Sequence, residues 1–177
     1  MQTLVVDKTL TFDFDPHVEA EIFDGWDHVT KHWTQRRNKK LIDVVSVESV
    51  SGGDTAWLIE VKDFRVINGP PKPSNIATLD QTVAKKVQDS LLGLADTAAN
   101  GAKSSEKAHA ANTMAATSRR VVLHLEPHVG AHTALFPTGF PASVLQKLKT
   151  LVAHIDPNPL VLDISRTARA GVPWIVR

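Results

Sequence analysis

Two apolar segments separated by a short polar turn restrict the fold of this 177-residue chain more than any other feature. Residues 41–50 are rich in valine, residues 56–64 are apolar over most of their length, and residues 51–54 (SGGD) lie between them. Two strands joined by a four-residue loop that contains glycine are typical of a β-hairpin. We therefore expect residues 41–50 to pair with residues 55–62 in an antiparallel arrangement.

Three charged residues interrupt the apolar pattern of this hairpin. If Val50 lies opposite Thr55, then Asp43 lies opposite Lys62, and Glu60 shares their face because side chains alternate along a strand. Asp43 and Glu60 are then diagonal neighbours, with backbones roughly 7–8 Å apart. A register shift of two residues preserves this arrangement, whereas a shift of one residue destroys it.

Two carboxylates and an ammonium on one face of apolar strands suggest a metal site. Burying such a group is costly, but the cost falls if the carboxylates of Asp43 and Glu60 hold a hard cation such as Mg²⁺, which prefers oxygen ligands. Lys62 could then orient a metal-bound water or offset charge that grows on a phosphate. The structural alternative is an ion pair between Asp43 and Lys62, with Glu60 at a solvated edge of the sheet.

The rest of the chain favours an α/β fold with a mixed central sheet and helices on both faces. Alternating or β-branched apolar residues predict further strands at residues 1–15, 119–127, 160–165 and 172–176. Apolar residues at helical spacing predict helices at residues 76–98 and from Pro141 onward. Residues 17–36 are expected to be helical in part, and residues 95–118 to form a surface helix or a connection.

Composition is ordinary for a soluble globular protein, and the length fits a single domain over residues 1–177. The net charge of +1 gives no global sign of a polyanionic partner, and the absence of cysteine excludes disulfides, thiolate metal sites and cysteine catalysis. No apolar run approaches the ~20 residues of a membrane span, and the N-terminus lacks the features of a signal peptide. We expect a cytoplasmic protein without a membrane contact.

Charge is distributed unevenly along the chain. Residues 1–30 carry a net charge of −6, and residues 31–40 (KHWTQRRNKK) hold five bases and no acid. A basic block is usually a solvated face, but it is also what a phosphate-binding patch looks like. Trp33 within this block is a candidate for contact with nucleic acid.

The spacing of Asp43 and Glu60-Val61-Lys62, with a gap of sixteen residues across a hairpin, resembles the PD-(D/E)xK nuclease superfamily. The phrase WLIEVKDFR is similar to the central strand of that superfamily, whose restriction-endonuclease-like core has the order α-β-β-β-α-β. The resemblance covers residues 17–126 and leaves residues 127–177 as an embellishment. Ile42 departs from the pattern, which often has proline before the aspartate.

The resemblance implies a Mg²⁺- or Mn²⁺-dependent hydrolysis of phosphodiester bonds in DNA. Asp43, Glu60 and the Val61 carbonyl correspond to the metal ligands, and Lys62 to the catalytic lysine. An acid from the first helix often completes such sites, and the candidates are Glu19, Glu21 and Asp27. A polar residue of the helix after E-x-K often contributes too, and the candidates are Lys85, Lys86 and Gln88.

The expected partner is nucleic acid, with DNA preferred, RNA open, and a homodimer left open. Its phosphates would be contacted by basic residues, namely Arg36, Arg37, Lys39, Lys40, Arg65, Lys85 and Lys86. The runner-up interpretation is a catalytically inactive member of the same fold that acts as a nucleic-acid- or protein-binding module.

Histidine spacing offers a third, weaker interpretation, a zinc hydrolase. His124, His128 and His132 are spaced by four, as are His28 and His32, which on a helix would align imidazoles as zinc ligands. Pro127 and Gly130 interrupt the first set, and a further ligand is missing from the second, so scattered histidines are the preferred interpretation.

Overall fold

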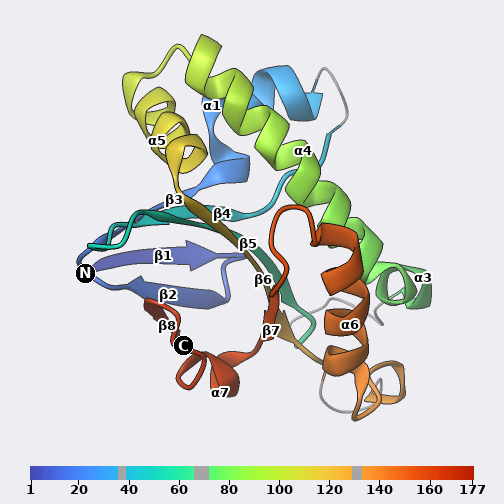
Figure 1. Ribbon diagram of the computed structural model, residues 1–177. Coiled ribbons are helices and arrows are strands. Elements are labelled where there is room, and N and C mark those ends of the chain that lie inside the picture. The colour runs from blue at the N-terminus through green and yellow to red at the C-terminus, as the bar shows by residue number, and fades with distance from the viewer. Residues whose placement is uncertain (36–38, 66–71, 129–132) are drawn as a thin grey trace.

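The computed structural model describes residues 1–35, 39–65, 72–128 and 133–177, which form an α/β structure with two sheets (Figure 1). The smaller sheet has the strand order β1-β2-β8 and the larger sheet the order β3-β4-β5-β6-β7. The strands are β1 (Gln2–Val6), β2 (Leu10–Phe14), β3 (Val18–Ile22), β4 (Val44–Glu48), β5 (Thr55–Asp63), β6 (Ser118–Glu126), β7 (Leu160–Leu162) and β8 (Trp174–Val176).

Helices occupy most of the remaining described residues. They are η1 (Phe23–Gly25), α1 (Asp27–Val29), η2 (Thr30–Thr34), α3 (Pro73–Ala77), α4 (Leu79–Asn100), α5 (Ser104–Ala115), η3 (Thr133–Leu135), α6 (Phe140–Val152) and α7 (Ile164–Thr167). The helices expected at residues 76–98 and from Pro141 onward are therefore present as α4 and α6. None of these described helices combines the length and apolar composition that a membrane crossing needs.

The larger sheet is mixed, as the sequence predicted. Strands β3, β4 and β5 pair antiparallel: a short loop turns the chain back between β4 and β5, whereas residues 23–43 connect β3 to β4. Strands β5, β6 and β7 pair parallel, because α4 and α5 carry the chain back before β6, and α6 does so before β7.

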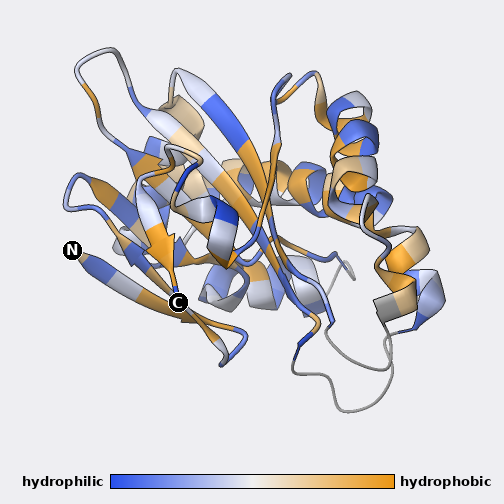
Figure 2. Ribbon diagram, turned by 90° about the horizontal axis from the view of Figure 1, so that it is seen from below, coloured by the Kyte–Doolittle hydropathy of each residue, from blue (hydrophilic) through white to orange (hydrophobic). Residues whose placement is uncertain are grey.

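The prediction of helices on both faces of the sheet holds only in part, because the short helix α7 is the helix that packs on the second face among the described residues. Helices α4, α5 and α6 cover one face, whereas β1, β2 and β8 cover the other (Figure 1). The inward residues of β1, β2 and β8 are large and apolar, so this small sheet can close the second half of the core as well as a helix would. Figure 2 shows apolar residues along the strands where these layers meet.

The N-terminal 15 residues form a hairpin, which the alternating pattern alone did not indicate. The chain turns at Asp7 and Lys8, whose φ angles of 52° and 63° lie in the left-handed region. Such angles are costly for residues other than glycine, so packing of the flanking strands must hold the turn in place.

The expected hairpin of β4 and β5 is present, but its register differs by two residues from the predicted one. Val44 lies opposite Ile59 and Glu48 opposite Thr55, so the loop spans residues 49–54. Val50 is 46% exposed, and its carbonyl accepts a hydrogen bond from Gly53, which has a φ of 114°. Because the side-chain period of a strand is two, this shift leaves every residue on its predicted face.

The segment 17–36 departs from the expected core order. It begins with β3 and becomes helical only from Phe23, so the first helical segment follows the first antiparallel strand. The expected α-β-β-β-α-β order would place that helix before all three strands. The valine and alanine on alternate positions of β3 are buried, and this alternation favours a strand over a helix.

Helix α4 supplies several of the buried side chains in the core between the helical layer and the sheet. Leu94, whose side chain is fully buried, packs in the core together with Phe23, Val29 and Leu41. Replacing Leu94 with alanine should lower the free energy of unfolding by about 2–5 kcal/mol, because a cavity remains in the core.

A matched control lies on the same helix. Leu92 is 57% exposed, so Leu92→Ala should change the free energy of unfolding by about 0.5 kcal/mol or less. Urea unfolding followed by circular dichroism measures both variants. Equal losses would contradict the placement of α4.

Candidate functional site: two buried carboxylates beneath three lysines

The predicted acidic pair lies where β4 and β5 separate. Asp43 directly precedes β4, and its Oδ2 accepts a hydrogen bond of 2.6 Å from the backbone N–H of Val61. Pairing between β4 and β5 ends at Ile59, so the Asp43 carboxylate accepts the hydrogen bond of the backbone N–H that a neighbouring strand would otherwise accept. Glu60 lies beside it on β5 with a fully buried side chain.

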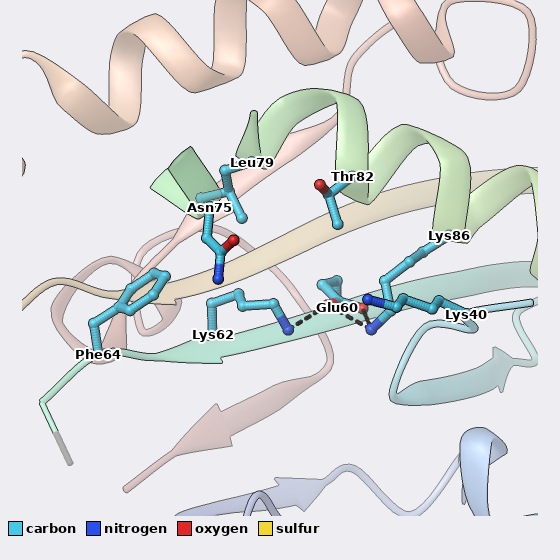
Figure 3. A pocket seen from close by; sticks show the side chains of 8 residues that line it. All are labelled: Lys40, Glu60, Lys62, Phe64, Asn75, Leu79, Thr82 and Lys86. Atoms are coloured by element: carbon cyan, nitrogen blue, oxygen red, sulfur yellow. Dashed lines mark hydrogen bonds and ion pairs between the residues drawn. The ribbon is translucent and has the colours of Figure 1, made fainter. Parts of the chain in front are cut away.

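Two ammonium groups contact Glu60, one from the strand and one from helix α4 (Figure 3). Lys86 Nζ lies 2.7 Å and 2.6 Å from the two carboxylate oxygens of Glu60, and 3.6 Å from Asp43 Oδ1. Lys62 Nζ lies 2.5 Å from Glu60 Oε1 and donates a hydrogen bond of 2.9 Å to the Val61 carbonyl. Asp43, Glu60 and Lys62 therefore meet at one place, as their predicted common face requires.

Burial determines the electrostatics of this site. Desolvation, and then the charge of Asp43, raise the pKa of Glu60 to about 7, although both lysines act in the opposite direction. Burial works to lower the pKa of Lys62, but the neighbouring Glu60 and Asp43 carboxylates hold it above its ordinary value. The cluster thus depends on mutual compensation of its charges.

A cavity of about 320 Å³ opens beside this cluster, between β5 and helices α3 and α4. Lys40, Lys62 and Lys86 all line it, with Glu60 as the carboxylate among the lining residues. Three ammonium groups face one carboxylate among the lining residues, and with Asp43 behind Glu60 the balance is three to two, which still suits an anion such as a phosphate.

The acids predicted to come from the first helix lie elsewhere. Glu19 and Glu21 are exposed residues of β3, and burial together with the nearby Glu106 raises the pKa of Glu21. Asp27 begins α1 but pairs with Lys103 at 2.7 Å. These positions follow from the strand that replaces the expected helix at residues 18–22.

Two acids that the sequence analysis did not single out, Asp24 and Asp7, lie close enough to the site for the charge of Asp43 to act on their pKa values. Asp24 of η1 lines a second cavity that also contacts Lys40 and Lys86. Burial, followed by the charge of Asp43, raises the pKa of both Asp24 and Asp7. The position of Asp24 directly after β3, at the end where β4 begins, was the signal that could have identified it.

Most of the predicted phosphate-binding residues are engaged within the chain. Lys39 and Lys85 pair with Asp89 at 2.9 Å and 3.2 Å, and Arg65 pairs with Asp63 at 2.9 Å. Lys40 makes no ion pair within the described part of the chain and lines both cavities. Arg36 and Arg37 lie outside the described residues, and Gln88 is exposed on α4.

The histidines do not form a zinc site in the described part of the chain. His124 is buried and lies 3.0 Å from Glu126, whereas Nδ1 of His128 donates to the Phe64 carbonyl at 2.9 Å. His28 pairs with Asp96 at 3.0 Å, and His132 lies outside the described residues. No group of three or more metal-binding side chains occurs among the residues that the structure describes.

Trp33 is buried in the core, and its indole N–H donates to Asp96 at 2.8 Å. Its side chain therefore contributes to packing of the helical layer, and its buried ring cannot stack on a nucleic-acid base.

The acidic pair offers oxygen donors that could hold a small divalent cation. Asp43, Glu60 and the Val61 carbonyl supply hard oxygen donors, which Mg²⁺ and Mn²⁺ prefer. The Lys86 ammonium lies between the two carboxylates, so the space between them already accepts a positive charge. Because two carboxylates alone are few ligands, water or substrate oxygens would have to complete the coordination.

Comparison with known proteins finds a distant similarity to part of a tRNA ligase. The chain is 26% identical, over an alignment 209 positions long, to "Cysteine--tRNA ligase" of Neisseria meningitidis serogroup A / serotype 4A (strain DSM 15465 / Z2491). The alignment covers 98% of this chain but only 30% of the ligase. No family model and no solved structure matches the chain.

Two adjacent lysines of α4 allow a matched test of the cluster. The side chain of Lys86 is 12% exposed and that of Lys85 is 68% exposed. Lys86→Met should lower the free energy of unfolding by about 3–5 kcal/mol at pH 8, because it leaves buried carboxylates with too few partners. Lys85→Met should cost about 0.5 kcal/mol or less.

The loss caused by Lys86→Met should depend on pH. The pKa of Glu60 is raised to about 7, so Glu60 binds a proton in the folded state at pH 5 while its unfolded form is ionised. At pH 5 the site therefore holds less buried negative charge that Lys86 must compensate. Lys86→Met should then lower the free energy of unfolding less at pH 5 than at pH 8. Urea unfolding in metal-free buffer measures it, and equal losses at both pH values would contradict the charged pair.

Proposed function

We propose that this site binds nucleic acid and hydrolyses its phosphodiester bonds with Mg²⁺ or Mn²⁺. The observation that carries the proposal is the pair of buried carboxylates bridged by the Lys86 ammonium, of which Glu60 lines a cavity together with three lysines. A structural ion pair needs neither a cavity nor an excess of cations around it. A phosphate site needs both.

Asp43, Glu60 and the Val61 carbonyl would hold the cation. A bound cation supplies positive charge that activates water and polarises a phosphoryl oxygen. Lys62 lines the cavity and also pairs with Glu60, so its ammonium is placed to stabilise negative charge that develops on the phosphate. Lys86 is held by the same carboxylates that would hold a cation, and once released from them it is free to contact a phosphate oxygen.

Both DNA and RNA are candidate substrates. The hairpin with Asp43 and Glu60-Val61-Lys62 resembles nucleases that act on DNA, whereas the relative in Neisseria meningitidis is named as a ligase of tRNA. The chain covers too little of that ligase to inherit its activity, so its name supports only the inclusion of RNA among the substrates to be tested.

A binding module without catalysis is the second candidate. Both carboxylate oxygens of Glu60 already contact ammonium groups, so its charge is compensated without a metal ion. In that case the cluster orders β5 and α4, and the cavity binds phosphate without cleaving it. The two candidates differ in whether an external cation displaces Lys86.

Substitution of Glu60 and Lys62 distinguishes an enzyme from a module. Glu60→Gln should abolish Mg²⁺- or Mn²⁺-dependent cleavage, because the amide keeps the shape of the side chain but loses the charge that binds the cation. Lys62→Ala should slow cleavage about 10²-fold or more while metal binding is largely retained. Glu19→Gln, on the exposed side of β3, is the matched control and should cleave normally.

The assay uses plasmid DNA, single-stranded DNA and RNA in parallel, and calorimetry measures metal binding. If the unsubstituted protein cleaves none of these with either metal, and calorimetry detects no metal, the module takes the place of the enzyme.

Lys40 should contribute to nucleic-acid binding through its free ammonium. Each phosphate contact adds about −0.9 to the slope of log affinity against log salt for duplex DNA, and about −0.7 for single strands. Lys40→Ala should therefore flatten the slope by about one contact. Lys147→Ala, an exposed lysine of α6 that does not line the cavity, should leave it unchanged. Fluorescence anisotropy at several salt concentrations measures the slope, and identical effects of the two variants would place the binding surface elsewhere.

A further inference from the structure

We infer that the cavity takes a single unpaired nucleotide, with the phosphate at its lysine end and the base against Phe64 and Asn75. This inference rests on the proposed function for the nature of the ligand, but not on catalysis. It assigns the substrate class as single-stranded nucleic acid or a nucleotide at a chain end.

The lining of the cavity divides into two chemically different ends (Figure 3). Lys40, Lys86 and Glu60 lie at one end, and Phe64 lies at the other, with Lys62 between them. Leu79 at the start of α4 adds an apolar side chain on the helical side. Inorganic phosphate would use only the charged end, whereas a nucleotide has a charged part and a flat apolar part that fit both ends.

Phe64 is held as a rigid platform directly after β5. Its backbone N–H donates to the Glu126 carbonyl at 2.9 Å, and its own carbonyl accepts from His128 Nδ1 at 2.9 Å. Its ring packs against Phe136 with a centroid distance of 5.1 Å, and Phe136 in turn packs against Phe140 at 5.4 Å. A ring that is ordered before binding loses little conformational freedom when a base stacks on it.

Asn75 supplies the polar group that a base edge requires. It lies on α3, its amide points into the cavity between Phe64 and Lys62, and the residue is exposed. An amide both donates and accepts hydrogen bonds, so it can pair with the edge of a base. A base within a duplex has its faces covered by stacking, and it can reach such a site only when it is unpaired.

Titration without metal tests this inference separately from catalysis. In buffer with a chelator, adenosine and uridine monophosphates should each bind the 177-residue protein about 5- to 100-fold more tightly than inorganic phosphate, because base stacking adds to the phosphate contact. Phe64→Leu keeps an apolar side chain but removes the aromatic face, and should abolish most of this gain. Its affinity for inorganic phosphate should stay unchanged.

Asn75→Ala is the second variant, and because Asn75 is exposed the fold should tolerate it. It should weaken the nucleotides several-fold and leave phosphate unaffected, whereas Asn112→Ala, an exposed asparagine of α5, should change neither. Circular dichroism confirms that each variant is folded.

The outcomes separate this inference from the proposed function. If phosphate binds but the nucleotides bind no more tightly, or if duplex DNA is cleaved as fast as single strands, the base site is overturned and the proposed function stands. If Phe64→Leu weakens phosphate as much as the nucleotides, Phe64 has a structural role and the inference fails. If neither phosphate nor nucleotide binds, both proposals fail.

Discussion

The contact between the Lys86 ammonium and two buried carboxylates is the interaction on which the rest of this site depends. A carboxylate as deeply buried as Glu60 cannot remain ionised beneath apolar strands without a cation close to it. Lys86 reaches it only because α4 packs across the sheet, through side chains such as Val83 and Val87 that are themselves fully buried. The position of the helix and the charge state of the strand therefore support each other.

The same arrangement creates the cavity. Strand β4 leaves β5 after Ile59, and the Asp43 carboxylate rather than a backbone group accepts the hydrogen bond of the buried N–H of Val61. The end of β5 is thus left free for Lys62 and Phe64 to line a space beneath α3 and α4.

The competition between an internal and an external cation connects the two candidate functions. An enzyme of the proposed kind needs the carboxylates to prefer a divalent ion over the tethered ammonium, whereas a binding module keeps the ammonium in place. Because a tethered group has a high effective concentration, the external ion must offer a large gain in charge interaction to displace it. Ligand phosphate would favour the exchange, since it provides a new partner for the released lysine.

The sequence by itself determined the hairpin, the common face of Asp43, Glu60 and Lys62, and the helix that carries Lys86, because strand alternation and helical spacing are local properties of the chain. Only the tertiary structure decided the register of the hairpin, since the loop at residues 49–54 closes against neighbouring elements and not through its glycines alone. It also decided that Lys86 rather than Lys85 reaches Glu60, that Asp24 faces the site, and that a sheet covers the second face. These features depend on contacts between residues far apart in the chain, and such contacts leave no periodic pattern in the sequence.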